Sequence, residues 1–353
     1  MRLWILPAII LILGLLSILT LSSIFPALAP KQLIFFMIGF AIFVGFSKIS
    51  FKRFQELSLL GYIGVIFLLI LTLIIGEATK GSHRWIDVGG IFAIQGSQLA
   101  IPTASLFLIT FFKKKPLTNL KNLFVFLTLV AIPGILILIE PDLGTTIVYL
   151  LSVLTILFFS KTRPLHMIPF IAGGFVTVLI AWLFVLQPYQ KARITSFISP
   201  DDTQGAGYNA RQSLIAVGSG QITGRGLGQG IQSHLRFLPE RQTDFVFASF
   251  AEEFGFIGAL LVLTLYTVLI VTILNTAQHA NFSEQLFCYV TAVMTTLQTG
   301  VNIGMNIGLL PITGITLPLL SYGGSSILTL LAMFGIIQSI RINQKPKVTL
   351  HLE

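Results

Sequence analysis

A cluster of charged residues runs directly into a long apolar segment at residues 236–258, which read RFLPERQTDFVFASFAEEFGFIG. Only 10% of the chain is charged and 54% is hydrophobic, so a local cluster of this density is unusual. The charged side chains of the segment are Arg236, Glu240, Arg241, Asp244, Glu252 and Glu253. Ionisable groups at the edge of an apolar helix usually face a cavity or a partner. We therefore expect the chemistry of the protein to lie in the surrounding stretch, residues 205–258.

The rest of the chain is apolar enough to be embedded in a membrane. Its 353 residues have a mean hydropathy of +0.90 and include 30 Phe. A membrane-spanning helix needs about 20 mostly apolar residues. Ten segments qualify: 3–22, 32–48, 57–76, 91–112, 122–140, 143–160, 165–186, 246–274, 284–309 and 316–340. We predict an all-α polytopic membrane protein with ten transmembrane helices, forming one domain over residues 1–353. The first segment is interpreted as a retained helix rather than a cleaved signal peptide.

The basic residues give this helix bundle an orientation. Lys and Arg concentrate in short connections at 47–53, 113–121 and 160–164 and in the tail at 341–347. By the positive-inside rule these segments are cytoplasmic, and so are both termini. The net charge of +9 therefore reflects membrane topology, and nothing in the sequence indicates nucleic-acid binding. The single Cys288 excludes a disulfide framework and a thiolate metal site.

The acidic residues gather toward the opposite face. Ten of the 13 carboxylates fall in or beside the other set of loops. The loop at 186–245 is far longer than the others, and it mixes amphipathic pieces with Gly-rich turns. Loops of that length inside a compact domain are usually functional. We predict a large extracytoplasmic loop of short amphipathic helices that covers the bundle and forms the working surface.

Asp244 lies where this loop meets the eighth predicted span. Thr243 or Asp244 is a plausible N-cap for the following helix, and local sequence favours that interpretation at least as much as catalysis. The neighbouring Arg236, Glu240 and Arg241 favour a chemical role. An aspartate among cations at a membrane surface is suited to holding a metal or to acting as a base toward a sugar hydroxyl.

Glu252 and Glu253 fall inside an apolar helix, about 100° apart around its axis. We expect one of them to join a polar network and the other to reach the loop, with structural ion pairing as a slightly favoured alternative. The run at 224–230, GRGLGQG, lacks the strand and the GK[ST] ending of a phosphate loop. Its amides, with Arg225, remain a weak candidate for a pyrophosphate site.

Further polar groups occur at the outer ends of the predicted helices. Asp142 is a candidate cap for the sixth span, and it can line a cavity at the same time. Arg84 is placed to pair with a lipid phosphate, because the adjacent Trp85 marks the headgroup level. Two prolines, several glycines and hydroxyls including Ser321 interrupt the last apolar block at 308–326. Such broken backbone at membrane depth must be buried in protein or line a cavity.

These motifs together resemble one family, the SEDS proteins RodA, FtsW and their relatives, which are ten-helix enzymes that polymerise lipid II into glycan strands. The matching segments are 84–87 (RWID), 140–145 (EPDLGT), 207–220, 238–245 (LPERQTDF), 251–255 (AEEFG) and 308–325. They span most of the chain in the expected order. Residues 233–241 are more similar to RodA, whereas 314–318 (GITLP) are more similar to FtsW, and the RodA branch is favoured.

The resemblance implies a peptidoglycan glycosyltransferase active in cell elongation, with division as the alternative. The family's catalytic aspartate falls on Asp244, expected to be the base or the ligand of an activating Mg²⁺ or Mn²⁺. An α-linked pyrophosphate that becomes a β-linked glycan requires inversion, so one base and one stabiliser of the leaving undecaprenyl pyrophosphate are needed. The predicted substrate-binding residues are Arg84, Asp142, Arg193, Gln212, Ser213, Arg225, Arg236, Glu240, Arg241, Glu252 and Ser321. The expected partners are lipid II, undecaprenyl-linked glycan and a class B penicillin-binding protein, in the bacterial cytoplasmic membrane.

Two departures from the family pattern stand out. The fourth span usually carries Gln-Pro-Ser-Glu-x-x-Lys, whereas this chain has Gln98 and Ile101 in place of the acid and the base. Losing both charges of a buried pair together is nearly neutral for stability, so catalytic efficiency rather than folding is in question. Gln242 stands where the family often has His. These substitutions keep a non-catalytic scaffold as an alternative, and the Pro-broken helices keep a lipid II flippase as another.

Overall fold

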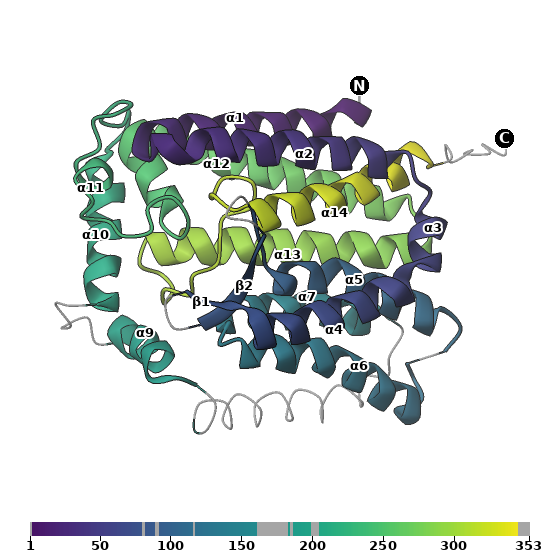
Figure 1. Cartoon of the computed structure of the whole chain (residues 1–353). Helices are drawn as coiled ribbons and strands as arrows, with labels where there is room; N and C mark the ends of the chain where they lie inside the picture. Colours follow the sequence, from purple (N-terminus) through teal and green to yellow (C-terminus); the bar gives the residue numbers. More distant parts are fainter. Residues whose placement is uncertain are drawn as a thin grey trace.

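The computed structural model describes residues 2–79, 82–88, 92–115, 117–160, 183, 186–198 and 205–344. The predicted span at 165–186 lies almost wholly outside these ranges. Within them the chain forms a helical bundle with one small sheet (Figure 1).

The first half of the chain contains six α-helices, three short 3₁₀ helices and the sheet within the described ranges. These elements are η1 (Arg2–Trp4), α1 (Ile5–Ile24), η2 (Pro26–Leu28), α2 (Ala29–Ser47), α3 (Phe51–Glu56), α4 (Ser58–Ile75), β1 (Glu77–Thr79), β2 (Ser82–Val88), β3 (Phe92–Ile94), α5 (Gly96–Phe111), η3 (Phe112–Lys114) and α6 (Leu120–Ile139).

The second half adds the remaining long helices and the short helices of the large loop. These elements are α7 (Leu143–Phe159), α9 (Pro188–Ile198), α10 (Ala206–Ser219), α11 (Ile231–His234), α12 (Val246–Gln278), α13 (Phe282–Asn306) and α14 (Gly324–Ile342). The predicted loop of short helices at 186–245 is thus confirmed, with α9, α10 and α11 as its helices.

Seven of the described helices are long and apolar enough to cross a membrane. They are α1, α2, α4, α6, α12, α13 and α14, and the shorter α5 and α7 are also apolar. Large apolar side chains such as Leu60 and Phe124 lie more than 70% exposed on the outside of the bundle, as expected for surfaces that contact lipid. The chain is therefore a multi-pass, mostly helical membrane protein.

The ends of the bundle differ in character (Figure 1). The start of α1, the end of α14 and the basic helix α3 lie at one end, whereas α9, α10 and α11 cover the other. This arrangement agrees with the predicted separation of the termini from the large loop.

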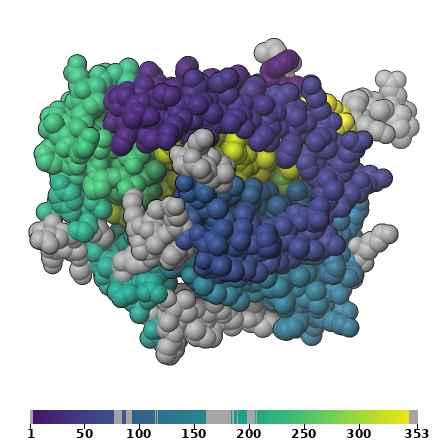
Figure 2. Space-filling view, in the orientation of Figure 1, coloured from purple at the N-terminus to yellow at the C-terminus, as the bar shows by residue number. Residues whose placement is uncertain are grey.

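Helix α14 forms the centre of the bundle, where it packs closely against α2. A Cβ on Gly39 of α2 would lie 2.4 Å from Leu331 Cδ1, so a larger residue there would require the Leu331 side chain to shift. Figure 2 shows α14 set back between α2 and α4 on one face of the molecule. Phe334 of α14 and Tyr266 of α12 are among the fully buried side chains of the core.

Two predicted spans were wrong at their first residues. The segment predicted at 91–112 starts with strand β3 and becomes helical only at Gly96. Strand β2 pairs antiparallel with both β1 and β3, with Trp85 opposite Glu77 and Ile86 opposite Ile94. The segment predicted at 316–340 becomes helical only at Gly324. Pro311 and Pro318 cannot donate helical hydrogen bonds. Residues 307–323, between α13 and α14, therefore form an irregular segment within the bundle.

Candidate active site

Asp244 is partly exposed at the start of α12. The N-cap of α12 is Phe245, and its side chain makes no capping hydrogen bond. The alternative in which Thr243 or Asp244 serves as the helix cap was therefore wrong. The Asp244 side chain lies at the boundary between the large loop and the bundle.

Two buried asparagines of α13 hold the backbone of Asp244 in place. The side-chain amide nitrogens of Asn302 and Asn306 donate to the Asp244 carbonyl oxygen at 3.0 and 3.1 Å. The Asn302 amide also donates to the Ile315 carbonyl at 2.7 Å, and the Asn306 side-chain oxygen accepts from the Ala248 N–H at 3.1 Å. Buried amides with several partners make a rigid support.

This asparagine pair was not among the predicted site residues. Asn302 and Asn306 lie four residues apart in an apolar helix, so they share one face, and polar side chains repeated at that spacing were the available signal.

The irregular segment before α14 supports the same part of the loop. The hydroxyl of Ser321 donates to the Thr243 carbonyl at 2.6 Å, and the N–H of Tyr322 donates to the Gln242 carbonyl at 2.9 Å. The amide of Gln32 in turn donates to the Ser321 carbonyl at 3.0 Å. Ser321, predicted to bind substrate, thus fixes the backbone immediately before Asp244.

Arg193 of α9 and Asp244 converge at Gly314. An atom at the Cβ position of Gly314 would lie 3.4 Å from Arg193 Nη1 and 3.4 Å from Asp244 Oδ2. The two side-chain atoms are therefore no more than twice that distance apart. Gly314 is exposed and has a φ of 78°, a conformation that glycine adopts without strain. Of the predicted cations, Arg193 is the one that the described geometry brings to Asp244.

Arg84 on β2 and Asp142 at the start of α7 form a second centre. Arg84 Nη1 lies 3.8 Å from Asp142 Oδ1, and Arg84 Nε donates to the Glu140 carbonyl at 3.0 Å. Asp142 also caps α7 by accepting from the Thr145 N–H at 3.2 Å, and it accepts from the Gln95 amide at 3.0 Å. The prediction that Asp142 caps this helix is confirmed.

The turn Glu140–Pro141–Asp142 connects this second centre to the Asp244 site. The amide of Gln190 on α9 donates to the Pro141 carbonyl at 3.0 Å, three residues before Arg193. A Cβ on Gly144 would meet Ile315 Cγ1 at 2.9 Å and the Thr313 carbonyl at 3.1 Å. The turn and the start of α7 therefore support both α9 and the segment that carries Gly314.

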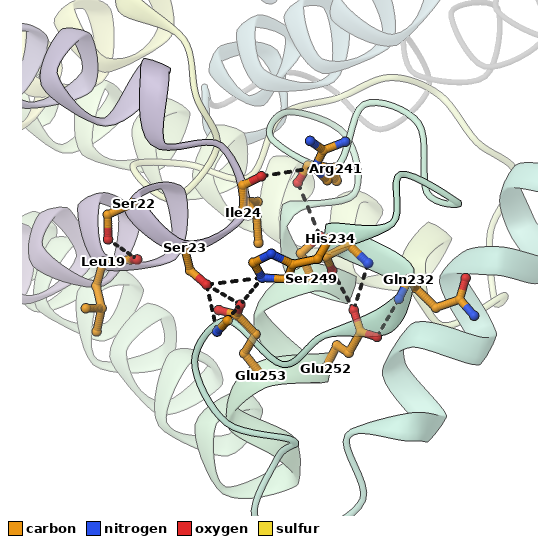
Figure 3. Close-up of polar contacts among 12 residues, drawn as sticks. Leu19, Ser22, Ser23, Ile24, Gln232, His234, Arg241, Ser249, Glu252 and Glu253 are labelled. Atoms are coloured by element: carbon orange, nitrogen blue, oxygen red, sulfur yellow. Dashed lines mark hydrogen bonds and ion pairs between the residues drawn. The ribbon is translucent and has the colours of Figure 1, made fainter.

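Glu252 and Glu253 both hold the large loop onto the bundle (Figure 3). Glu252 is 0% exposed; its Oε1 accepts from the Gln232 N–H at 2.8 Å, and its Oε2 accepts from the Ser233 N–H at 3.0 Å and from the Ser233 hydroxyl at 2.5 Å. Glu253 Oε1 accepts from the Gly228 N–H at 3.1 Å and from His234 Nε2 at 3.0 Å.

Ser23 of α1 adds its hydroxyl to Glu253 Oε1. The expectation that only one of the two glutamates reaches the loop was therefore wrong, because α12 is broken at Gly255 and the loop passes around the break. Glu252, predicted to bind substrate, has both carboxylate oxygens bonded to α11.

The Gly-rich run wraps this break and uses its amides there. The N–H groups of Arg225 and Gly226 donate to the carbonyls of Glu252 and Glu253, each at 3.0 Å. A Cβ on Gly224 would lie 2.0 Å from the Glu253 carbonyl oxygen. These contacts do not support a pyrophosphate cradle formed by the amides of this run.

Arg241, another predicted substrate ligand, is buried between the large loop and α1. It is 8% exposed, its Nε donates to the Ile24 carbonyl at 3.2 Å, and its guanidinium lies 5.3 Å from the centre of the Phe25 ring. Burial, and secondarily the charge of Arg236, lowers the pKa of Arg241. Its contacts join the loop to α1 (Figure 3).

The remaining predicted ligands occupy varied environments. Ser213 is buried and donates to the Asn306 carbonyl at 2.9 Å, which anchors α10 beneath the site, and Gln212 beside it is partly exposed. Glu240 accepts from the Thr243 hydroxyl at 3.1 Å. Arg225 and Arg236 are exposed on the loop, and no contact of the described residues joins their side chains to Asp244.

The substituted positions of the fourth predicted span are buried. Ile101 is 0% exposed within the apolar core, so a charge at this position would require a partner. Gln98 is 6% exposed, and its side-chain oxygen has no hydrogen-bond partner within the described part of the chain. The absence of both charges is thus compatible with a packed core.

The donor set near Asp244 limits the kind of metal site that fits. In the described ranges no group of three or more His, Cys, Asp and Glu side chains is placed to hold a metal ion. Mg²⁺ is often bound through one or two carboxylates, with waters and substrate phosphates completing its coordination. Asp244 therefore fits a metal ion carried largely by a substrate pyrophosphate, and not one enclosed by protein ligands.

The chain matches the family model of FtsW, RodA and SpoVE, described as cell cycle proteins, over residues 1–346. It is 38% identical over 312 residues to the peptidoglycan glycosyltransferase MrdB of Escherichia coli K12, covering 87% of this chain and 84% of the relative. It is also 38% identical over 321 residues to a probable peptidoglycan glycosyltransferase FtsW of Buchnera aphidicola, covering 89% and 83%.

Among solved structures, the fold matches a chain of a peptidoglycan synthase complex with a TM-score of 0.83 and 27% identity, covering 97% of this chain and 98% of that one. It matches the rod shape determining protein RodA of Thermus thermophilus with a TM-score of 0.73, 26% identity and the same coverage. The protein therefore belongs to the FtsW/RodA/SpoVE family.

Proposed function

We propose that this protein is a peptidoglycan glycosyltransferase that polymerises lipid II, with Asp244 as its central catalytic residue. The names of its relatives support the reaction class. The observation that carries the proposal is the convergence of Asp244 and Arg193 at Gly314, above a support of buried asparagines. An acid and a cation at the edge of a membrane bundle suit the joining of two lipid-linked sugars.

The proposed reaction is a single displacement with inversion. Asp244 accepts the proton of the 4-hydroxyl of one lipid-linked disaccharide as that oxygen attacks the anomeric carbon of another. The bond to undecaprenyl pyrophosphate breaks, and the leaving group departs with its electron pair. Arg193 is placed to stabilise the negative charge that develops on the pyrophosphate, because both side chains face the same exposed glycine.

The asparagine pair holds the backbone of Asp244, so the residue does not move away from the acceptor hydroxyl. Because the pair binds the backbone carbonyl, these bonds do not occupy the carboxylate. A divalent metal, when bound at Asp244 together with the pyrophosphate, would supply further charge neutralisation.

The setting of the reaction is also proposed. The basic connections place both termini in the cytoplasm and the large loop outside it, in the bacterial cytoplasmic membrane. Similarity to RodA and to a chain of a peptidoglycan synthase complex supports a role in cell elongation together with a class B penicillin-binding protein.

Polymerisation of purified lipid II tests the function. The protein, bound to its cognate transpeptidase, is assayed with Mg²⁺ or with a chelator as wild type, Asp244→Asn and Arg193→Gln. Glu56→Gln serves as the control because the side chain of Glu56 is 60% exposed on α3, at the other end of the bundle. We expect polymer from wild type and Glu56→Gln, and none from Asp244→Asn.

We expect Arg193→Gln to polymerise at least tenfold more slowly, since it removes one electrostatic stabiliser of the leaving group. If none of the proteins forms polymer while the complex remains intact, the proposal is wrong. Headgroup movement across vesicles would then favour a flippase, and cell growth supported by Asp244→Asn would favour a scaffold.

A further inference from the structure

Glu140 is a buried carboxyl that no step of the proposed reaction uses. It directly follows α6, and its side chain is 0% exposed. Neither of its carboxylate oxygens has a hydrogen-bond partner among the described residues. An ionised carboxylate without a partner is very costly in such a place, whereas the neutral acid carries no charge to desolvate.

The groups around Glu140 explain why no partner reaches it. Arg84 is engaged with Asp142, with the Glu140 carbonyl and with the Pro141 carbonyl. The Asp142 carboxylate accepts from Gln95 and from the Thr145 N–H. Arg84, whose charge acts on Glu140, is thus shared with a second acid, Asp142. This arrangement suits one negative charge in the turn rather than two.

This turn carries two parts of the Asp244 site. The Pro141 carbonyl accepts from Gln190, which fixes α9 and with it Arg193. The start of α7 at Gly144 packs against the backbone of Thr313 and the side chain of Ile315, on either side of Gly314. A change of charge within the turn therefore acts on the groups that face Asp244.

We propose that Glu140 is a positioning residue that works as a neutral acid, and that its ionisation disrupts the Arg84–Asp142 pair and displaces α9 and the Gly314 segment from Asp244. The inference rests on the proposed glycosyltransferase function. It predicts that polymerisation is lost at alkaline pH through a group that does not touch substrate.

The charges around Glu140 set the direction of this pH dependence. The charged side chains on the surrounding elements are Arg84 and Asp87 on β2, Asp142 at the start of α7, and Lys191 and Arg193 on α9. Burial, and then the charge of Asp142, raise the pKa of Glu140 to about 8, while Arg84 opposes the rise. The neutral form therefore predominates below that pH and is lost as the pH rises through it.

The test compares polymerisation between about pH 6 and pH 10 in the complex with its transpeptidase. Its proteins are wild type, Glu140→Gln, which imitates the neutral acid, and the exposed control Glu56→Gln. Above the pKa we expect the rates of wild type and Glu56→Gln to fall about tenfold per pH unit relative to Glu140→Gln. Infrared difference spectra between the two ends of the range should show a protonated carboxyl band that disappears in wild type and is missing in Glu140→Gln.

The outcomes separate this inference from the proposed function. Polymer from wild type with the same pH profile in Glu140→Gln would overturn the role of Glu140 and leave the function standing. A lack of polymer at every pH would overturn the function, while the infrared band would still report the protonation of Glu140. If Glu140→Gln fails to fold, the band in wild type decides alone, and its absence near pH 6 overturns the proposal.

Discussion

Replacing Glu252 by Gln should loosen the large loop much more than replacing Glu253 by Gln, although both side chains are buried. Both oxygens of Glu252 accept hydrogen bonds from α11, from the Gln232 N–H and from the N–H and hydroxyl of Ser233. A Gln at this position turns one acceptor into a donor, so at least one backbone N–H then faces an N–H group. Glu253 receives all its bonds at Oε1, and its Oε2 has no partner in the described part of the chain. The amide nitrogen of Gln fits at that second position without losing a bond.

The size of the effect follows from these contacts. A hydrogen bond to a charged group contributes about 1.5–3 kcal/mol, and leaving a buried donor unsatisfied costs about 1–3 kcal/mol. Relief of the buried charge offsets part of the loss, so we expect Glu252→Gln to lower the free energy of local opening by about 3 kcal/mol. Glu253→Gln should lower it by about 1 kcal/mol, since its bonds persist in weaker, uncharged form.

Hydrogen exchange of the amides of Gln232 and Ser233 measures this opening directly. A loss of about 3 kcal/mol corresponds to roughly hundredfold faster exchange in Glu252→Gln, against less than tenfold in Glu253→Gln. Polymerisation should fall in the same order, because the loop carries Asp244 at its end. Equal exchange in the two variants, or faster exchange in Glu253→Gln, would refute the assignment of Glu252 as the main attachment of the loop.

Two further predictions concern the support of the site. Asn306→Ala removes a donor to the Asp244 carbonyl and the acceptor for the Ala248 N–H. We expect the free energy of unfolding in denaturant to fall by about 2–4 kcal/mol, and polymerisation to be at least tenfold slower. Retained stability and rate would contradict the supporting role of Asn306. Glu140 has an ordinary pKa of 4.5 that folding raises to about 8, so between these values only the unfolded chain releases the proton and stability falls by about 1.4 kcal/mol per pH unit, or about 5 kcal/mol in all. Wild type should therefore unfold more easily as the pH rises from about 4.5 to about 8, with no further loss from this group above that range, whereas Glu140→Gln shows no such loss. Parallel pH dependence of the two proteins would contradict the buried, neutral state.

Sequence patterns located the membrane helices because apolar runs of that length have few other structural explanations. The predicted limits failed where local chemistry competes with hydropathy. Residues 92–94 are apolar enough to extend a helix, yet they pair with β2. Residues 316–323 are apolar as well, but prolines and glycines keep them irregular until α14 begins. Hydropathy averages over such segments and does not report their backbone conformation.

The sequence by itself determined the helical membrane fold and the large loop between two spans, because each is encoded in contiguous runs of apolar or polar residues. It also indicated Asp244 as the candidate base, through motifs along the chain that resemble one family. Only the tertiary structure showed that Arg193, among the predicted cations, lies beside Gly314 together with Asp244. It also showed that Asn302 and Asn306 hold the backbone of Asp244. It showed further that Glu252 and Arg241 attach the large loop to the bundle. These assignments depend on which distant segments touch, and a buried polar group and a substrate-binding one look alike in sequence until their partners are known.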